Sequence, residues 1–263
     1  MRKLLLNFYC LLFTVSLSAQ DSFQLAPPLL KYSSIFFGKQ TTLNIKFNQP
    51  GASVYYTTNG EEPTTQSNVY VKPITISQNF TTIKAKAIGN NFIPSSTEAV
   101  VFIKDGLPIK NVEFTKPNPQ YPGSGNNSLT DNKGGNTSAN NNTWSGYNCD
   151  TVTISLALKK EKPVQSVLLN FLQNESSWIF LPEQITAEWY NKETGSYKLL
   201  AAENISSKKE TAGSNCVYRL LSSAQKIKTD KIRIRILVKK SIPSWHPGKG
   251  NHAWMFIDEV KVY

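Results

Sequence analysis

Hydrophobic and polar residues alternate along most of this chain, and the spacing typical of an α-helix is almost absent. Towards the N-terminus the alternation forms about five short stretches, of which Ile83, Ala85 and Ala87 are one example. Turn-forming residues separate them, and Asn59-Gly60 suits a tight hairpin. Several short strands at this spacing are typical of a small β-sandwich, which we therefore expect in this part of the chain.

A second series of alternating stretches runs from residue 112 to the C-terminus. Its clearest member contains Ile232, Ile234 and Ile236, separated by basic residues. Residues 123–143 are rich in Gly, Asn and Ser and cannot bury much apolar area, so we expect a long loop at one end of the domain. About 150 residues of antiparallel strands fit a jelly-roll sandwich. The predicted fold class is therefore all-β, with two sandwiches.

The N-terminus has the pattern of a secretory leader. Arg2 and Lys3 precede a mostly apolar run at 4–17, and small residues follow at Ser18 and Ala19. The run is too short for a comfortable membrane span, and no later segment is apolar enough for one. We expect cleavage near Ala19, with 1–19 as the signal peptide, and a secreted, periplasmic or cell-surface product.

The formal net charge is +11, from 29 basic and 18 acidic residues. The lysines are scattered, with neither a run of five nor a basic helix. A basic solvated surface is the plain interpretation, and contact with acidic glycans or an anionic cell surface is the alternative. Because export also argues against it, no nucleic-acid partner is expected.

Two cysteines, Cys149 and Cys216, follow the leader. In an exported protein they could form a disulfide, and the alternative is two separate thiols. The sequence leaves both interpretations open. With only two histidines in the chain, the cysteines make a poor zinc ligand set.

The first half contains a more specific motif. The stretch YYTTNGEEPT at 55–64, with IKAKA at 83–87, resembles the chitobiase/β-hexosaminidase C-terminal domain over residues 26–104. The resemblance implies an immunoglobulin-like sandwich that often acts as a spacer. Tyr55 and Tyr56 are interpreted as hairpin packing rather than as a sugar platform.

The second half contains motifs in a characteristic order: LTDNKGG at 129–135, WSG at 144–146, SSWIFLPEQI at 176–185, PSWHPGKG at 243–250 and AWMFIDEV at 253–260. Over residues 112–263 this order resembles the discoidin module, or coagulation-factor C-type module, of Bacteroidetes family 20 glycoside hydrolases. In those enzymes it follows the chitobiase-type domain. The resemblance implies a galactose-binding-like jelly roll whose end loops hold carbohydrate.

The same resemblance implies one structural calcium ion. Asp131 and Glu259 match the positions of its carboxylate ligands, and calcium prefers several hard oxygens in a flexible loop. Asn132 stands where the family usually has glycine. The alternative is that Asp131 only forms a turn and that Glu259 is a surface residue.

A sugar site needs flat apolar faces for the pyranose ring and fixed polar groups for its hydroxyls. Besides asparagines at 126–142, the predicted carbohydrate-binding residues are Trp144, Tyr147, Trp178, Trp245, His246 and His252. Each could instead pack within the sandwich end. The expected partner is a glycan containing N-acetylhexosamine or galactose, bound by a monomer with an affinity of roughly millimolar to tens of micromolar.

No catalytic centre is predicted. Glycosidases need two carboxylates that face each other, whereas the neighbours Asp258 and Glu259 point to opposite faces of a strand. Motifs for nucleophilic, metalloprotease or phosphate chemistry are absent from the sequence. We therefore predict a secreted, non-catalytic carbohydrate-binding protein. The alternatives are an envelope protein that binds a protein partner and a detached C-terminal part of a β-N-acetylhexosaminidase.

Overall fold

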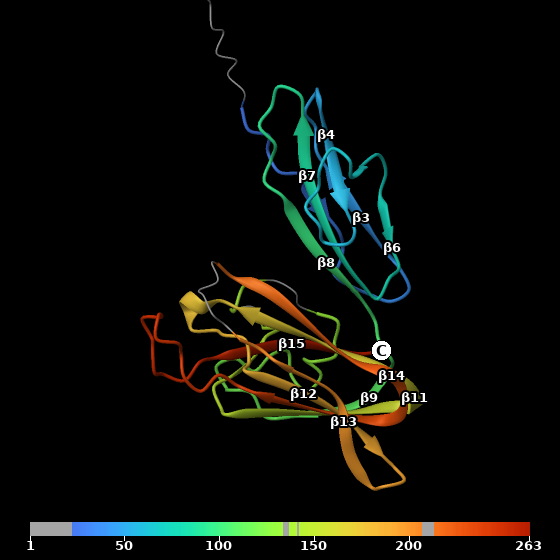
Figure 1. Cartoon of the computed structure of the whole chain (residues 1–263), viewed down its shortest axis with the longest axis vertical. Helices are drawn as coiled ribbons and strands as arrows, with labels where there is room; N and C mark the ends of the chain where they lie inside the picture. The colour runs from blue at the N-terminus through green and yellow to red at the C-terminus, as the bar shows by residue number, and fades with distance from the viewer. Residues whose placement is uncertain (1–22, 134–136, 141, 207–212) are drawn as a thin grey trace, which may run out of the picture. The chain divides into compact units, whose positions relative to one another are not determined.

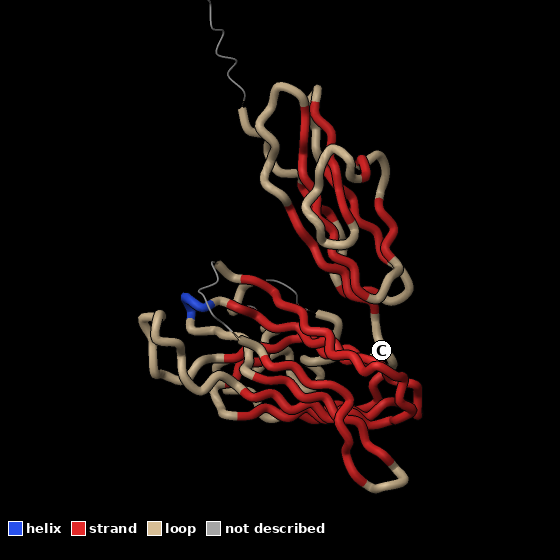
Figure 2. Tube along the Cα trace, viewed as in Figure 1, coloured by secondary structure: helices blue, strands red, loops and turns tan. Residues whose placement is uncertain are grey.

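The computed structural model describes residues 23–133, 137–140, 142–206 and 213–263, so the predicted leader lies outside the described residues. Apart from one short 3-10 turn, the regular structure within these residues is β-strand (Figures 1 and 2). The prediction of an all-β fold is therefore confirmed. None of the described helical structure is long and apolar enough to cross a membrane. The chain divides into two compact units.

The N-terminal strands form a three-stranded and a five-stranded sheet. The first sheet contains β1 (Leu29–Lys31), β3 (Thr41–Lys46) and β6 (Ile74–Ile76). The second contains β2 (Phe36–Phe37), β8 (Glu98–Lys104), β7 (Phe80–Gly89), β4 (Ala52–Thr57) and β5 (Asn68–Val69), in that order. In β7 the side chains of Ile83, Ala85 and Ala87 are buried and those between them are not. This period of two is the one that the sequence predicted.

The turn at Asn59-Gly60 is longer than predicted. Gly60 has a φ of 81°, as a turn at this position requires, and the Asn59 side chain accepts a hydrogen bond from the Glu61 N–H at 3.1 Å. However, β4 ends at Thr57 and its partner β5 begins only at Asn68. The prediction of a tight hairpin here was wrong, because Asn59-Gly60 opens a broad loop.

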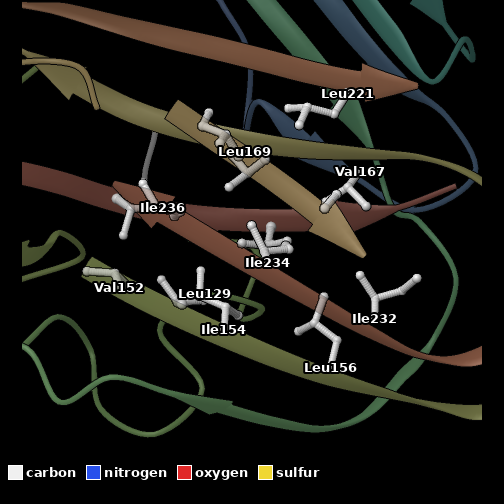
Figure 3. Packing of buried hydrophobic residues seen from close by; sticks show 14 of the residues in the cluster. Leu129, Val152, Ile154, Leu156, Val167, Leu169, Leu221, Ile232, Ile234 and Ile236 are labelled. Carbon is white, nitrogen blue, oxygen red and sulfur yellow. The ribbon is translucent and has the colours of Figure 1, made fainter. Parts of the chain in front are cut away.

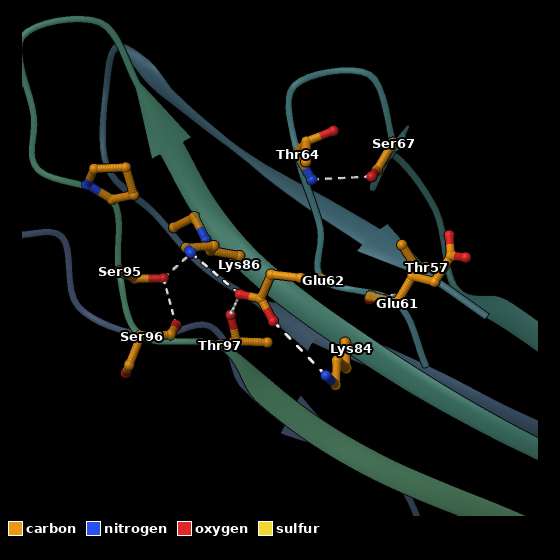
Figure 4. Close-up of polar contacts among 12 residues, drawn as sticks. Thr57, Glu61, Glu62, Thr64, Ser67, Lys84, Lys86, Ser95, Ser96 and Thr97 are labelled. Carbon is orange, nitrogen blue, oxygen red and sulfur yellow. Dashed lines mark hydrogen bonds and ion pairs between the residues drawn. The ribbon is translucent and has the colours of Figure 1, made fainter. Parts of the chain in front are cut away.

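Glu62 lies in this loop and ties it to the five-stranded sheet. Its carboxylate accepts hydrogen bonds from the Thr97 hydroxyl and, at 3.1 Å, from the Lys86 ammonium, and Lys84 lies 3.7 Å away (Figure 4). The Thr97 hydroxyl first, and then Lys86, lower the pKa of Glu62. Because the carboxylate is exposed, these contacts position the loop more than they stabilise the sheet.

The C-terminal part contains β10, β15, β11, β14, β12 and β13 in that order, and β9 pairs with β11. These strands are β9 (Ile109–Phe114), β10 (Ser145–Tyr147), β11 (Thr151–Gln173), β12 (Gln184–Asn191), β13 (Ser196–Asn204), β14 (Asn215–Leu237) and β15 (Met255–Val262). The long strands β11 and β14 pair along their length, with register shifts between Ala157 and Lys162 and between Val164 and Ser166. Such irregularities let strands bend, so one strand pair can serve both layers of a sandwich.

The two halves of β11 and β14 enclose one hydrophobic core (Figure 3). Strand β9 pairs with the half of β11 that contains Ile154, and β12 pairs with the half of β14 that contains Ile234. Strand β15 pairs with the other half of β11, which contains Leu169. All three side chains are fully buried in the same cluster. The predicted alternation at Ile232, Ile234 and Ile236 is therefore confirmed, and the second part is a jelly-roll sandwich.

The described part of the Gly/Asn/Ser-rich segment is a loop, as predicted, but it is not detached from the core. Leu129 is fully buried in the main cluster, and its carbonyl accepts a hydrogen bond from the Val260 N–H at 2.8 Å. This anchor fixes the following residues, 130–132, beside β15. The loop therefore has a defined course at one corner of the sandwich.

Candidate functional site

His246 joins two loops at one end of the second sandwich. Its side chain is buried, its Nε2 lies 2.9 Å from the Glu175 carbonyl oxygen, and its Nδ1 accepts a hydrogen bond from the Gly248 N–H at 2.9 Å. Since Nδ1 accepts, Nε2 carries the proton and donates to Glu175. Both nitrogens are thus occupied, and the prediction that His246 contacts sugar directly was wrong. The ring instead holds the loop 242–252 to the turn η1 (Glu175–Ser177).

Trp178 ends the η1 turn and remains partly exposed. It adopts a left-handed backbone conformation with a φ of 64°, and its N–H donates to the Glu175 carbonyl at 2.8 Å. A Cβ on Gly248 would lie 2.8 Å from Cε2 of the Trp178 indole, so the glycine leaves room for the ring. The indole is 39% exposed, as a stacking surface requires, and its backbone conformation is uncommon for a bulky residue.

Trp245 comes from the second of the two loops and is 37% exposed. Its ring centroid lies 6.2 Å from that of Phe180 and 5.6 Å from that of His246. Trp245 is therefore packed in part against the loop base and is in part open to solvent. His246 thus connects two loops that each carry a partly exposed tryptophan, Trp178 and Trp245.

His252 is half-buried near the end of the same loop. Its Nδ1 lies 2.9 Å from the Ala253 carbonyl oxygen and its Nε2 lies 3.4 Å from the Asp150 carboxylate. Lys240 contacts the same carboxylate at 2.6 Å and, with His252, lowers the pKa of Asp150. A sugar-binding role for His252 stays a prediction.

Trp144 and Tyr147 do not lie on the surface. Each is 1% exposed, and the Tyr147 hydroxyl donates to the Thr115 carbonyl at 2.9 Å, while burial raises its pKa. The physical reason is that the stretch after Trp144 forms β10, which pairs with β15 and is buried throughout. A packed ring has no face for a pyranose, so the prediction of these two residues as stacking platforms was wrong.

A polar hollow of about 230 Å³ lies beside Trp144. It is lined by Gln120, Tyr121, Pro122, Gly123, Ala139, Asn140, Asn142 and Trp144. Tyr121 packs 5.2 Å from the Trp254 ring and 4.7 Å from the Phe256 ring, measured between centroids. Tyr121 is not among the residues that the sequence predicted to bind carbohydrate. Its position before Pro-Gly, a turn signal, was the available hint that it would stand at a loop base.

The predicted calcium ligands occupy different environments. Asp131 accepts hydrogen bonds from the Lys133 N–H at 2.9 Å and from the Ser124 hydroxyl, so both of its oxygens are used within the loop. Glu259 is fully buried and accepts a hydrogen bond from the Asn132 N–H. Burial raises the pKa of Glu259 to about 7, against the opposing effect of the nearby Lys261 ammonium. The alternative that Glu259 is a surface residue is therefore wrong.

These residues do not fit a calcium ion. Calcium takes about six to eight oxygen ligands, so it would need the carboxylate oxygens of Asp131 and Glu259 as well as carbonyl oxygens of the loop. The Lys261 ammonium lies 2.9 Å from the second oxygen of Glu259 and donates to the Asn132 side-chain oxygen. The oxygens that a cation would use at this corner already bind an ammonium group.

Cys149 and Cys216 are not joined by a disulfide. Cys149 is exposed, whereas Cys216 is partly buried on β14. Burial, and then the nearby Asp258 carboxylate, raise the pKa of the Cys216 thiol to about 12. Of the two interpretations left open by the sequence, the structure has two separate cysteines.

Comparison with known protein families finds one match, which lies in the first sandwich. Residues 33–100 match the family model of the chitobiase/beta-hexosaminidase C-terminal domain. The resemblance expected from the motifs in this part of the chain is confirmed. No curated protein sequence matches the chain.

Several solved structures are similar to part of this chain. The family 32 CBM of NanJ from Clostridium perfringens, in complex with galactose, is 18% identical with a TM-score of 0.38, over 58% of this chain and 91% of that one. A GH89 CBM32 module from Clostridium perfringens, in complex with GlcNAc-α-1,4-galactose, is 18% identical with a TM-score of 0.37, over 59% and 91%. A Ruminococcus gnavus GH29 fucosidase in complex with fucose is 14% identical with a TM-score of 0.33, over 58% of this chain. The match spans only 24% of the fucosidase.

Proposed function

We propose that this chain is a secreted, non-catalytic protein that binds glycans at the loop end of its second sandwich. The observation that carries the proposal is the pair of partly exposed indoles, Trp178 and Trp245, on two loops that His246 joins. Aromatic rings stack on the C–H face of a pyranose, and a fixed position lowers the entropy lost on binding. The proposed site consists of these two indoles and His252.

The proposed affinity follows from the small area of such a site. Stacking one face of a sugar ring buries on the order of 100 Å² and contributes roughly 2–3 kcal/mol. A few hydrogen bonds, exchanged against water, contribute about 1 kcal/mol each. The sum corresponds to a Kd of roughly millimolar to tens of micromolar.

The match of the first sandwich to the C-terminal domain of chitobiases and β-hexosaminidases supports glycans that contain N-acetylhexosamine as ligands. Galactose-containing glycans are the second class to test. The proposed protein is a monomer that acts outside the cytoplasm after removal of the leader predicted at 1–19.

The environment of the acidic pair supports a non-catalytic role. Asp258 and Glu259 are both fully buried on β15, and Glu259 is paired with Lys261. The register of β15 against β11 shifts between Leu169 and Phe171, and Ile257 and Val260 both lie in the core cluster, so the strict alternation predicted for Asp258 and Glu259 is interrupted. Because both carboxylates are buried, neither is placed to flank a glycosidic bond. In this proposal the protein binds sugar without cleaving it.

Calorimetric titration with N-acetylglucosamine and galactose oligosaccharides tests the proposal. Replacing Trp178 or Trp245 with alanine removes a stacking face, and we expect affinity to fall about tenfold or more for either variant. Leu199 is a matched control, since it is a large exposed hydrophobic residue on β13. Leu199→Ala should bind like the unchanged protein. Equal affinity in all variants, or no binding to either series, would contradict the proposal.

A further inference from the structure

The corner between the loop 129–132 and β15 contains a buried charged pair that sugar binding does not explain. Glu259 is fully buried and Lys261 is 5% exposed. The two residues are separated by one position on β15, so their side chains leave the strand on the same face. The loop is held beside this face by the hydrogen bond from Val260 to Leu129.

Three residues form a closed ring at this corner. The Asn132 N–H donates to one oxygen of Glu259, and the Lys261 ammonium lies 2.9 Å from the other. The same ammonium donates to the Asn132 side-chain oxygen, which closes the ring. Asn132 has a φ of 61°, a conformation that asparagine tolerates better than most residues. A second carboxylate, that of Asp105, lies 3.8 Å from the ammonium.

A buried carboxylate requires a compensating cation, because removing its charge from water without one is costly. Lys261 supplies that charge from within the chain. A divalent ion bound to Glu259 and Asn132 would have to share these two ligands with the ammonium and would be repelled by it. Asp131, the remaining predicted ligand, is already held by Lys133 and Ser124.

We infer that the Lys261 ammonium takes the place of the calcium ion expected at this corner and joins the loop 129–132 to β15 as an internal cation. The fold of the second sandwich is then independent of calcium. This inference concerns the architecture of the domain and does not depend on whether the loop end binds sugar.

Thermal unfolding of the full chain tests the inference first without any substitution. We expect the same Tm in EDTA and in millimolar calcium chloride, to within about 1 °C, because a ligand that does not bind cannot shift unfolding. Magnesium chloride at equal concentration controls for ionic strength. A saturable rise in Tm of about 3 °C or more with calcium alone would overturn the inference.

Substitutions then separate the ammonium charge from simple packing. Lys261→Met keeps the aliphatic stem and leaves Glu259 uncompensated, so we expect Tm to fall by about 6 °C or more. Lys110→Met is the matched control, since Lys110 is an exposed lysine in β9, and it should leave Tm nearly unchanged.

Adding Glu259→Gln to Lys261→Met removes the uncompensated charge and should restore much of the lost Tm. A Lys261→Met variant as stable as the unchanged protein, or a double variant with no recovery, would contradict the inference. If Lys261→Met does not fold, Lys261→Arg serves in its place, because it retains the charge and should stay folded without calcium. A Tm of Lys261→Arg that rises with calcium would also contradict the inference that the side chain at position 261 acts as an internal cation.

Discussion

At the scale of single residues, the exposure and contacts of a side chain at the loop end cannot be predicted from its residue type alone. Trp178 and Trp144 are both tryptophans next to turn-forming sequence, yet the first is 39% exposed and the second 1%. His246 was predicted to contact sugar but contacts Glu175, which lies 71 positions earlier in the chain. A single residue's role here is set by contacts that are distant in the sequence.

Gly248 offers a test at this scale. A Cβ at this position would lie 2.8 Å from the Trp178 indole and 3.2 Å from Nδ1 of His246, so Gly248→Ala must displace the ring. We expect reduced glycan affinity, a change in tryptophan fluorescence and a stability loss of about 1–3 kcal/mol. Ser244→Ala, an exposed change in the same loop, should alter none of these properties. Unchanged fluorescence and binding in Gly248→Ala would contradict the described packing.

The two cysteines should react at different rates with an alkylating reagent. At pH 7.5 the Cys216 thiol, with its pKa raised to about 12, has almost no reactive thiolate, and it is partly buried, whereas Cys149 is exposed. We expect rapid labelling at Cys149 and slow labelling at Cys216, measured on the separate peptides by mass spectrometry. Both sites should react rapidly after denaturation. Protection of both thiols that a reductant removes, as a disulfide would give, or equal rates in the folded protein would contradict this prediction.

At the scale of elements, the sequence predicted those strands in which hydrophobic residues recur at every second position. The alternation at Ile232, Ile234 and Ile236 predicted a strand with one buried face, and β14 has it. The segment around Trp144 and Tyr147 was too short for its period to be read. It is a strand only because it pairs with β15, more than a hundred positions later.

The ring at Asn132 could not be predicted for a similar reason. Its partner Lys261 is 129 positions away, and the sequence around each residue gives no sign of the other. Resemblance supplied Glu259 as a candidate ligand, but only the packing shows that an ammonium already occupies the corner. Long-range pairing of this kind is fixed by the whole fold and not by local preference.

Leu129 tests whether the loop belongs to the core. Its side chain is fully buried although it lies in a segment without regular structure. Leu129→Ala should therefore cost about 2–5 kcal/mol in unfolding free energy, as a core substitution does, measured by denaturant unfolding. Leu199→Ala, at a site that is 62% exposed, should cost much less. Similar small losses in both variants would show that the loop is not anchored at this position.

At the scale of the whole molecule, the chain combines two β-sandwiches and carries a formal net charge of +11. The first matches a domain family named for chitobiases and β-hexosaminidases, and the second contains the loop end proposed to bind sugar. The neighbouring carboxylates Asp258 and Glu259 of β15 are fully buried, so this pair is not placed to act on a bound glycan. The function proposed for the whole molecule is therefore that of a glycan-binding accessory protein.

The indole N–H signals of the five tryptophans provide the most direct test of this account. In NMR spectra of the ¹⁵N-labelled protein, titration with N-acetylglucosamine and galactose oligosaccharides should shift the signals of Trp178 and Trp245. The signals of Trp144 and Trp189, which pack against or within the core, should stay in place. Shifts at Trp144 alone would move the site to the hollow beside Tyr121. That result, or no shift with any oligosaccharide, would contradict a sugar site at the two exposed indoles.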